Sequence, residues 1–201
     1  MAGESEAAFY GFDVMGHGIL ASLMAFSLRD LLPVLGWGRG GQAPAPAEIV
    51  HSLYERYGRK GEGAIGSTFF TIAYGTMDTV TGDYRVARAG YTPVLHLEAG
   101  GRMRVHYTKG AAVGVMIDAD VEEATGILAP GDRLIIASDG LLAAFGDGLL
   151  ESCLERLSAF ADRFRGASLE DFVEAFRQHS RESTESRSRD DDVSLLVIER
   201  A

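Results

Sequence analysis

Apolar residues near the N-terminus recur with the spacing of an amphipathic helix. The first such stretch begins at Ile19, and Pro33 is expected to end it because proline lacks the N–H that a continuing helix needs. Its apolar positions are Ile19, Leu20, Leu23, Met24, Phe26, Leu31 and Leu32. A glycine-rich loop over 36–41 follows, and the residues from Ala47 to Tyr57 then predict a second helix.

From residue 67 onward the chain changes to short runs rich in β-branched and aromatic side chains, which is typical of strands. Turn residues separate these runs. With one run near the N-terminus, the predicted strands cover residues 9–12, 68–74, 83–89, 94–97, 103–107, 121–128, 133–137 and 193–199. Before the last strand we expect helices over 149–164 and 169–180, with Ser168 as an N-cap, and a loop over 181–189.

This order of elements indicates an α+β fold, because helices come first, then a block of strands, a helix pair and one closing strand. We expect two packed antiparallel β-sheets flanked by helices on their outer faces. The 201 residues suit one domain, 1–201, which is large enough for a hydrophobic core.

Charge and composition exclude several classes of protein. The net charge of −10, without a cluster of Lys or Arg, argues against a nucleic-acid partner, because phosphate binding requires a basic face. No apolar run approaches the roughly 18 residues of a membrane span, and the N-terminus lacks a signal-peptide pattern, so a cytoplasmic location is expected. The single cysteine, Cys153, cannot form an internal disulfide.

Acidic residues close to glycine mark the ends of three predicted strands. Asp13 follows the first strand, Asp139 follows the strand over 133–137, and three aspartates at 190–192 precede the closing strand. Carboxylates at strand ends suit a hard cation such as Mg²⁺ or Mn²⁺, which prefers oxygen ligands. If the three strand ends converge, these carboxylates predict a metal site.

Each of these positions also has a simpler interpretation. Asp13 could be a solvated turn residue, and the Asp139-Gly140 pair could form a hairpin turn. The run over 190–192 could be a charged, solvated segment. His17 could act as a general acid, or it could only contribute to the start of the helix that follows.

Five segments of the chain, in order, carry motifs of a known family. They are Asp13-Val14-Met15-Gly16-His17-Gly18, Ala89-Gly90-Tyr91-Thr92-Pro93, Gly110-Ala111-Ala112-Val113-Gly114-Val115, Pro130-Gly131-Asp132 leading into Ser138-Asp139-Gly140, and Asp191-Asp192-Val193-Ser194-Leu195-Leu196. The chain resembles bacterial phosphatases of the stage II sporulation protein E type, the prokaryotic branch of the metal-dependent protein phosphatase 2C superfamily. The resemblance covers nearly the whole chain and implies an α-β-β-α sandwich.

The resemblance also implies catalytic metal ligands. Asp13 would bridge two Mn²⁺ or Mg²⁺ ions, the backbone carbonyl of Val14 would complete one of them, and Asp139 and Asp191 would hold the other. The run of aspartates leaves the register open between Asp190 and Asp191. Asp191 is chosen because the residues after it then align with the closing strand of the family.

Residues beside these ligands complete the expected site. Gly16 and Gly140 would let the backbone approach the ions closely, and Asp192 adjoins the last ligand. In eukaryotic relatives the proposed general acid stands two residues after the first aspartate, where this chain has Met15. This difference favours a structural role for His17 at the start of the helix.

The implied activity is hydrolysis of phosphoserine or phosphothreonine on a signalling protein, such as an anti-sigma-factor antagonist, by a metal-activated water. The chain would be the C-terminal output part of a longer sensor or response-regulator protein. Hydrolysis of small phosphoesters is a more remote alternative.

One motif of the family is not found in the chain. Family members carry an earlier Gly-Gly-Asp strand that supplies a carboxylate to the second metal, whereas the only acids before Phe9 are Glu4 and Glu6. We therefore expect up to two ions, with one good site and one weakened site. Without this strand a sheet edge would be exposed. The alternative function is thus a degenerate, non-catalytic domain that binds a protein or forms a homodimer through that edge.

Overall fold

The computed structural model describes residues 5–36, 43–58, 69–115, 119–146, 149–187 and 192–201. It contains two compact units, each built on its own four-stranded antiparallel sheet. The first unit comprises Met1–Pro93 and Tyr107–Ile127, and the second comprises Val94–His106 and Leu128–Ala201. Both sheets carry helices, so the α+β class predicted from the sequence is confirmed.

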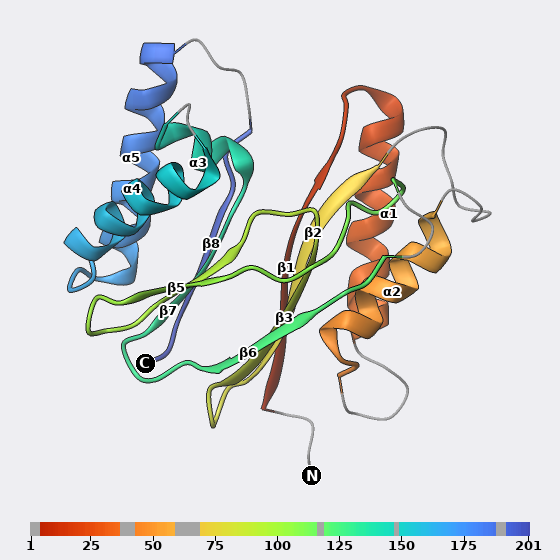
Figure 1. Cartoon of the computed structure of the whole chain (residues 1–201), viewed down its shortest axis with the longest axis horizontal. Helices are drawn as coiled ribbons and strands as arrows, with labels where there is room; N and C mark the ends of the chain where they lie inside the picture. The colour runs from red at the N-terminus through yellow and green to blue at the C-terminus, as the bar shows by residue number, and fades with distance from the viewer. Residues whose placement is uncertain (1–4, 37–42, 59–68, 116–118, 147–148, 188–191) are drawn as a thin grey trace. The chain divides into compact units, whose positions relative to one another are not determined.

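The elements follow one another along the chain as Figure 1 labels them. They are β1 (Glu6–Val14), α1 (Ile19–Gly36), α2 (Pro46–Tyr57), β2 (Phe70–Asp78), β3 (Asp83–Ala89), β4 (Val94–Leu97), β5 (Met103–His106), β6 (Glu123–Ile127), β7 (Arg133–Ala137), α3 (Asp139–Ala144), α4 (Leu150–Arg163), α5 (Leu169–Arg187) and β8 (Leu195–Glu199).

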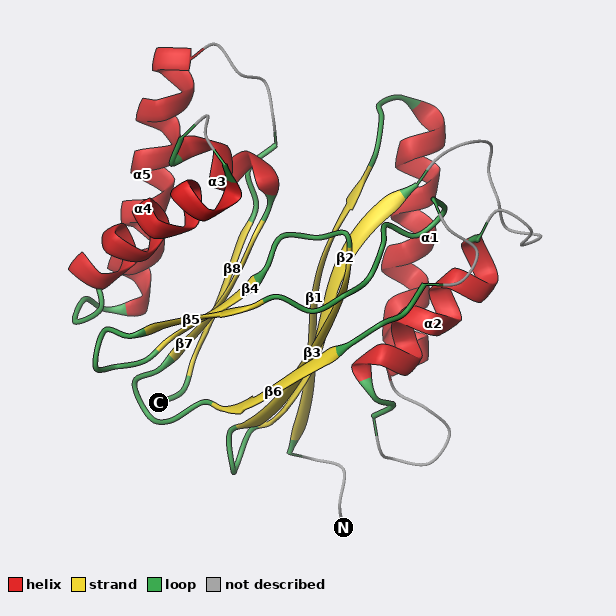
Figure 2. Cartoon of the chain, in the orientation of Figure 1, coloured by secondary structure: helices red, strands yellow, loops and turns green. Residues whose placement is uncertain are grey.

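The sheet of the first unit has the strand order β1-β2-β3-β6. β1 pairs with β2 over its full length, from Glu6 opposite Asp78 to Val14 opposite Phe70. Within the described residues β1 is therefore an edge strand. Helices α1 and α2 both lie on one face of this sheet, as Figure 2 shows.

The helices of the first unit pack on the sheet through fully buried side chains. Leu28 of α1 and Leu53 of α2 are 0% exposed, and burial of each such side chain stabilises the fold by about 1.5–3 kcal/mol. Tyr54 of α2 is also buried, and its hydroxyl donates to the carbonyl of Ala111. Burial raises the pKa of Tyr54 to about 12, so this hydroxyl remains a donor at neutral pH.

The sheet of the second unit has the strand order β5-β4-β7-β8. Helices α3, α4 and α5 cover one of its faces, and their apolar side chains form one core with the strands. Phe172 and Phe176 of α5 are 0% exposed there. Ser168 caps α5 as predicted, because its hydroxyl accepts a hydrogen bond from the N–H of Asp171 at 3.1 Å.

Arg133 ties the first residue of β7 to two other parts of the second unit. Its side chain is only 4% exposed, and it pairs with Glu199 of β8 at 2.5 Å. It also donates to the carbonyls of Phe164 and Ala167, which lie between α4 and α5, and its guanidinium lies 4.4 Å from the centre of the Phe172 ring. One cation therefore satisfies several groups that the fold buries.

A buried acid–imidazole pair lies close to Arg133. Asp132 is held at 2.8 Å by Nε2 of His96 and also accepts hydrogen bonds from the N–H groups of Ala99 and Ala129. Burial acts to raise the pKa of Asp132, but these hydrogen bonds together outweigh it and lower the pKa below its usual 3.8. The turn before β7 is thus fixed by an ionised carboxylate.

Four local predictions were wrong. α1 continues through Pro33 to Gly36, because a proline near the C-terminal end removes only one helical hydrogen bond. α5 continues to Arg187, through most of the expected loop. β1 extends to Val14, so Asp13 lies inside the strand. Asp139 begins the short helix α3, which was not predicted.

Among the residues that the structure describes, none of the helices combines the length and the apolar composition that crossing a bilayer demands.

We expect replacement of Arg133 by Met to destabilise the protein by about 2–3 kcal/mol, because it leaves buried carbonyls and Glu199 without their cation. The matched control is Arg104→Met, since Arg104 pairs with Glu98 at the same 2.5 Å but is 51% exposed. The control should change the free energy of unfolding by less than about 1 kcal/mol. Urea unfolding measures both, and equal losses would contradict the role of burial.

Asp132 should make stability depend on pH in the acid range. The pKa of Asp132 is lowered in the folded state, so the ionised carboxylate stabilises the folded protein above about pH 4. This stabilisation is lost as the pH falls through the pKa of Asp132 in the folded state. We expect Asp132→Asn to be less stable than the unchanged protein at pH 7, with a difference that narrows below pH 4. Thermal unfolding across pH measures this, and a constant difference would refute the assignment.

Candidate active site

Asp13 is placed by the pairing of β1 with β2. It lies opposite Thr71, and its neighbours Phe12 and Val14 pack against the core under α1 and α2. Because successive side chains of a strand point to opposite faces, Asp13 lies on the face of the sheet away from these helices. Its side chain is exposed, as a ligand to a cation and a substrate requires.

The turn between β1 and α1 depends on two glycines. Gly16 and Gly18 have φ angles of 97° and 90°, in the left-handed region that other residues avoid. The carbonyl of Gly18 accepts the first helical hydrogen bond, from the N–H of Ser22 at 3.1 Å. His17 lies between the two glycines, four residues after Asp13 in the sequence, and its side chain is exposed.

Three of the motif segments meet around the start of β2. The N–H of Met15 donates to the carbonyl of Phe69 at 2.9 Å, and Phe70 exchanges two backbone hydrogen bonds with Val113. The N–H of Gly90 donates to the carbonyl of Gly110 at 2.8 Å. The segments over 13–18, 89–93 and 110–115 are therefore one connected structure in the first unit.

The remaining two motif segments belong to the second unit, where Asp139 is the first residue of α3. Ser138 precedes it as the N-cap, with its side chain 6% exposed, while Asp139 is exposed. One carboxylate oxygen of Asp139 accepts the N–H of Gly140 at 2.9 Å. A negative charge in the first turn of a helix is favourable, so this position suits a carboxylate.

The hydroxyl of Ser138 connects three segments. It donates to the carbonyl of Asp192 at 3.1 Å and accepts the N–H groups of Ser194 and Leu141 at 2.9 and 3.4 Å. These three bonds use the whole hydrogen-bonding capacity of a hydroxyl group. They hold the chain that enters β8, at Asp192, beside the start of α3, at Asp139.

The predicted ligands are thus only partly brought together. Asp139 and the backbone of Asp192 are neighbours in the second unit, whereas Asp13 and Val14 lie in the first unit. Asp191 and Asp190 lie outside the described residues. Within the described part of the chain, no group of three His, Cys, Asp or Glu side chains could hold a metal ion. The ligand set therefore stays a prediction.

The donors that are described fit a hard cation chemically. Asp13 and Asp139 are exposed carboxylates on backbone that pairing and capping hold rigid. Oxygen ligands of this kind, with room left for water, are what Mg²⁺ and Mn²⁺ require.

Ser138 is the residue of this region whose role was not predicted. A serine directly before an Asp-Gly pair is a possible N-cap, and that signal was present in the sequence. The signal was missed because the helix it caps has only six residues and no periodic apolar pattern.

The family profile described as Stage II sporulation protein E (SpoIIE) matches residues 3–201. No curated protein matches the chain in a sequence search.

Several solved structures share the fold. The SiaA-PP2C domain of Pseudomonas aeruginosa is 20% identical with a TM-score of 0.72, covering 97% of this chain and 80% of that one. The RsbU and RsbW domains of Rv1364c from Mycobacterium tuberculosis are 21% identical with a TM-score of 0.68, and the match covers 99% of this chain and 53% of that one. RsbX in complex with magnesium is 14% identical with a TM-score of 0.64, and the match covers 98% of this chain and 82% of that one.

The present chain thus spans about half the length of the Rv1364c chain. At these identities the structural likeness shows the fold, which is that of PP2C phosphatase domains. The profile match extends over almost all of the sequence and includes all five motif segments. The chain belongs to the stage II sporulation protein E family of PP2C-like phosphatase domains.

Proposed function

We propose that this chain is a metal-dependent serine/threonine phosphatase that hydrolyses phosphoserine or phosphothreonine on a signalling protein. The observation that carries the proposal is the Ser138 hydroxyl, which holds Asp139 beside the chain segment of Asp192. Two acidic positions from distant parts of the sequence are thereby neighbours at the tips of adjacent strands. Membership of a family of phosphatase domains supports the same function.

Four positions would hold up to two metal ions. Asp13 would be shared by the two ions, the carbonyl of Val14 would complete one of them, and Asp139 and Asp191 would hold the other. A bound divalent cation would supply Lewis-acid polarisation of the phosphate and a lowered pKa for a coordinated water. RsbX was solved in complex with magnesium, which supports a hard cation in this fold.

The residues of the chain have their own tasks in this proposal. The cap at Ser138 would keep the Asp139 carboxylate in place without a change of backbone during turnover. The glycines at 16 and 18 would present the backbone at the start of α1 closely to the site. Exposed carboxylates would admit a phosphorylated side chain that is still part of a folded protein, as the substrate of a protein phosphatase must be.

The proposed biological setting is regulatory. RsbU and RsbW domains occur together in the solved Rv1364c chain, of which this chain covers 53%, so a domain of this fold occurs there as part of a longer protein. We propose that this chain is likewise an output domain whose substrate is a small phosphorylated regulator, such as an anti-sigma-factor antagonist.

A second candidate function is a non-catalytic binding domain. β1 is an edge strand within the described residues, and an unpaired edge can accept a strand from another chain. In this second function the edge of β1 would be the working surface. The phosphatase would turn over substrate at saturating Mn²⁺, and the binding domain would not. If the binding domain forms a homodimer, its molecular mass measured by light scattering would rise with protein concentration.

Removal of the Asp139 carboxylate tests the phosphatase. We expect Asp139→Asn to lower hydrolysis of a phosphothreonine peptide in Mn²⁺ by at least about 100-fold, because a direct ligand is lost, and chelation with EDTA to abolish it. Glu155→Gln, on an exposed face of α4, is the charge-matched control and should leave the rate unchanged. Hydrolysis that survives both Asp139→Asn and chelation would overturn the proposal, and absence of turnover in the unchanged chain would favour the binding domain.

Ser138→Ala tests the positioning role of the hydroxyl. The substitution leaves three backbone groups without their partner, so we expect a loss of about 1–2 kcal/mol in stability and a higher Mn²⁺ concentration for half-maximal activity. Ser52→Ala removes a hydroxyl of α2 that donates to the carbonyl of Glu48 one turn earlier, outside the site, and should change neither quantity. Unaltered Mn²⁺ dependence in Ser138→Ala would show that the cap does not position a ligand.

A further inference from the structure

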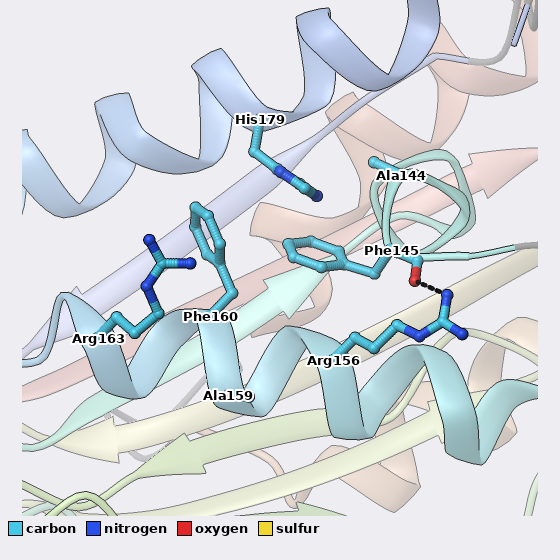
Figure 3. A pocket seen from close by; sticks show the side chains of 7 residues that line it. All are labelled: Ala144, Phe145, Arg156, Ala159, Phe160, Arg163 and His179. Atoms are coloured by element: carbon cyan, nitrogen blue, oxygen red, sulfur yellow. Dashed lines mark hydrogen bonds between the residues drawn. The ribbon is translucent and has the colours of Figure 1, made fainter. Parts of the chain in front are cut away.

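A pocket of about 410 Å³ lies in the second unit, where three helices meet, and Asp139 is not among its lining residues. Figure 3 shows it from close by. Ala144 and Phe145 contribute from the end of α3, Phe160 and two arginines from α4, and His179 from α5. The volume is in the range of pockets that take small organic ligands, which is roughly 300–1,000 Å³.

Three rings in mutual contact form the apolar part of this pocket. The centre of the Phe145 ring lies 4.4 Å from the centre of the His179 ring and 5.4 Å from that of Phe160. The ring centres of Phe160 and His179 are 4.9 Å apart. In Figure 3 the His179 ring extends from α5 toward Phe145. A surface of this kind favours a flat aromatic group, which can stack on the rings or meet their edges.

His179 has an unsatisfied polar atom in this surface. Its Nε2 is buried, and no hydrogen-bond partner is present among the described residues. A buried polar atom without a partner costs about 1–3 kcal/mol, so such atoms are rare in folded proteins. A polar group of a bound ligand would remove this cost.

Two exposed arginines flank the rings. Arg156 donates one N–H to the carbonyl of Phe145 at 3.2 Å, and the Arg163 guanidinium lies 5.8 Å from the centre of the Phe160 ring. Within the described residues neither has a carboxylate partner, whereas Arg165, just after α4, and Arg177 of α5 are paired with acids. In a chain of net charge −10, two unpaired cations beside one aromatic surface are a specific attraction for an anion.

We propose that this pocket binds a small aromatic carboxylate. Its ring lies on Phe145 and Phe160, its carboxylate pairs with a guanidinium of α4, and a polar atom of the ligand reaches Nε2 of His179. The two arginines are seven residues apart, about 10.5 Å along the helix, so a compact ligand lies between them. The pocket suits one or two fused rings rather than a longer peptide.

The test is a titration of the full chain with 2-naphthoate, followed by calorimetry and by NMR of the histidine rings. We expect saturable binding with a Kd of about 1 mM or below, as ligands of this size commonly reach. The neutral analogue 2-naphthamide should bind at least about tenfold more weakly, because it lacks the charge that the arginines attract. Equal binding of the two compounds, or no saturation with naphthoate by about 10 mM, would overturn the proposal.

Variants locate the binding. The double substitution Arg156→Gln and Arg163→Gln should weaken naphthoate binding by more than tenfold, and His179→Phe, which keeps a ring but removes Nε2, by about threefold to tenfold. The matched control, Arg165→Gln with Arg177→Gln, removes the same charge outside the pocket and should leave Kd unchanged. Unchanged affinity for naphthoate in the pocket variants would refute the site. Tighter binding of a short peptide with the sequence Glu-Phe-Glu than of naphthoate at this pocket would refute it as well. Thermal unfolding confirms that each variant is folded, and no metal or phosphatase activity is needed for the readout.

Discussion

The hydroxyl group of Ser138 is the interaction on which the candidate active site depends. It is bonded to Asp192, Ser194 and Leu141, and it therefore joins the end of β7, the start of α3 and the entrance to β8. Asp139 is adjacent to it in the chain. Without this hydroxyl, the two acidic segments would be joined by the ladder between β7 and β8 and by the backbone hydrogen bond from Ser138 to the carbonyl of Ser194.

The motifs divide between the two units in a way that reflects their physical tasks. The segments over 13–18, 89–93 and 110–115 are linked by backbone hydrogen bonds around Phe70, and Tyr54 adds a bond from α2 to Ala111. The other two segments are linked through Ser138. Much of what makes these sequences recognisable is thus backbone geometry that holds Asp13 and Asp139, and only a few of the motif residues would contact a metal or substrate.

Burial decides what each charged side chain of the second unit can do. Arg133 is nearly enclosed and its hydrogen bonds satisfy groups of the fold, while Arg104 forms an equally short pair that water screens. Asp132 is kept ionised by hydrogen bonds despite its burial. Arg156 and Arg163 are exposed, and neither forms an ion pair within the described residues, which leaves their charge available to a ligand. The short helix α3 links these regions, since Asp139 begins it and Phe145 follows its end.

The sequence by itself determined the fold class, the family motifs and the bounds of β3, β4 and β7, because alternating apolar residues and turn residues are local signals. It also placed Asp13 and Asp139 at the ends of strands to within two residues. Only the tertiary structure decided that α3 exists, that α5 runs to Arg187, and that Ser138 joins two acidic segments. The physical reason is that these features depend on hydrogen bonds and packing between residues as far as 56 positions apart, and local spacing contains no information about them.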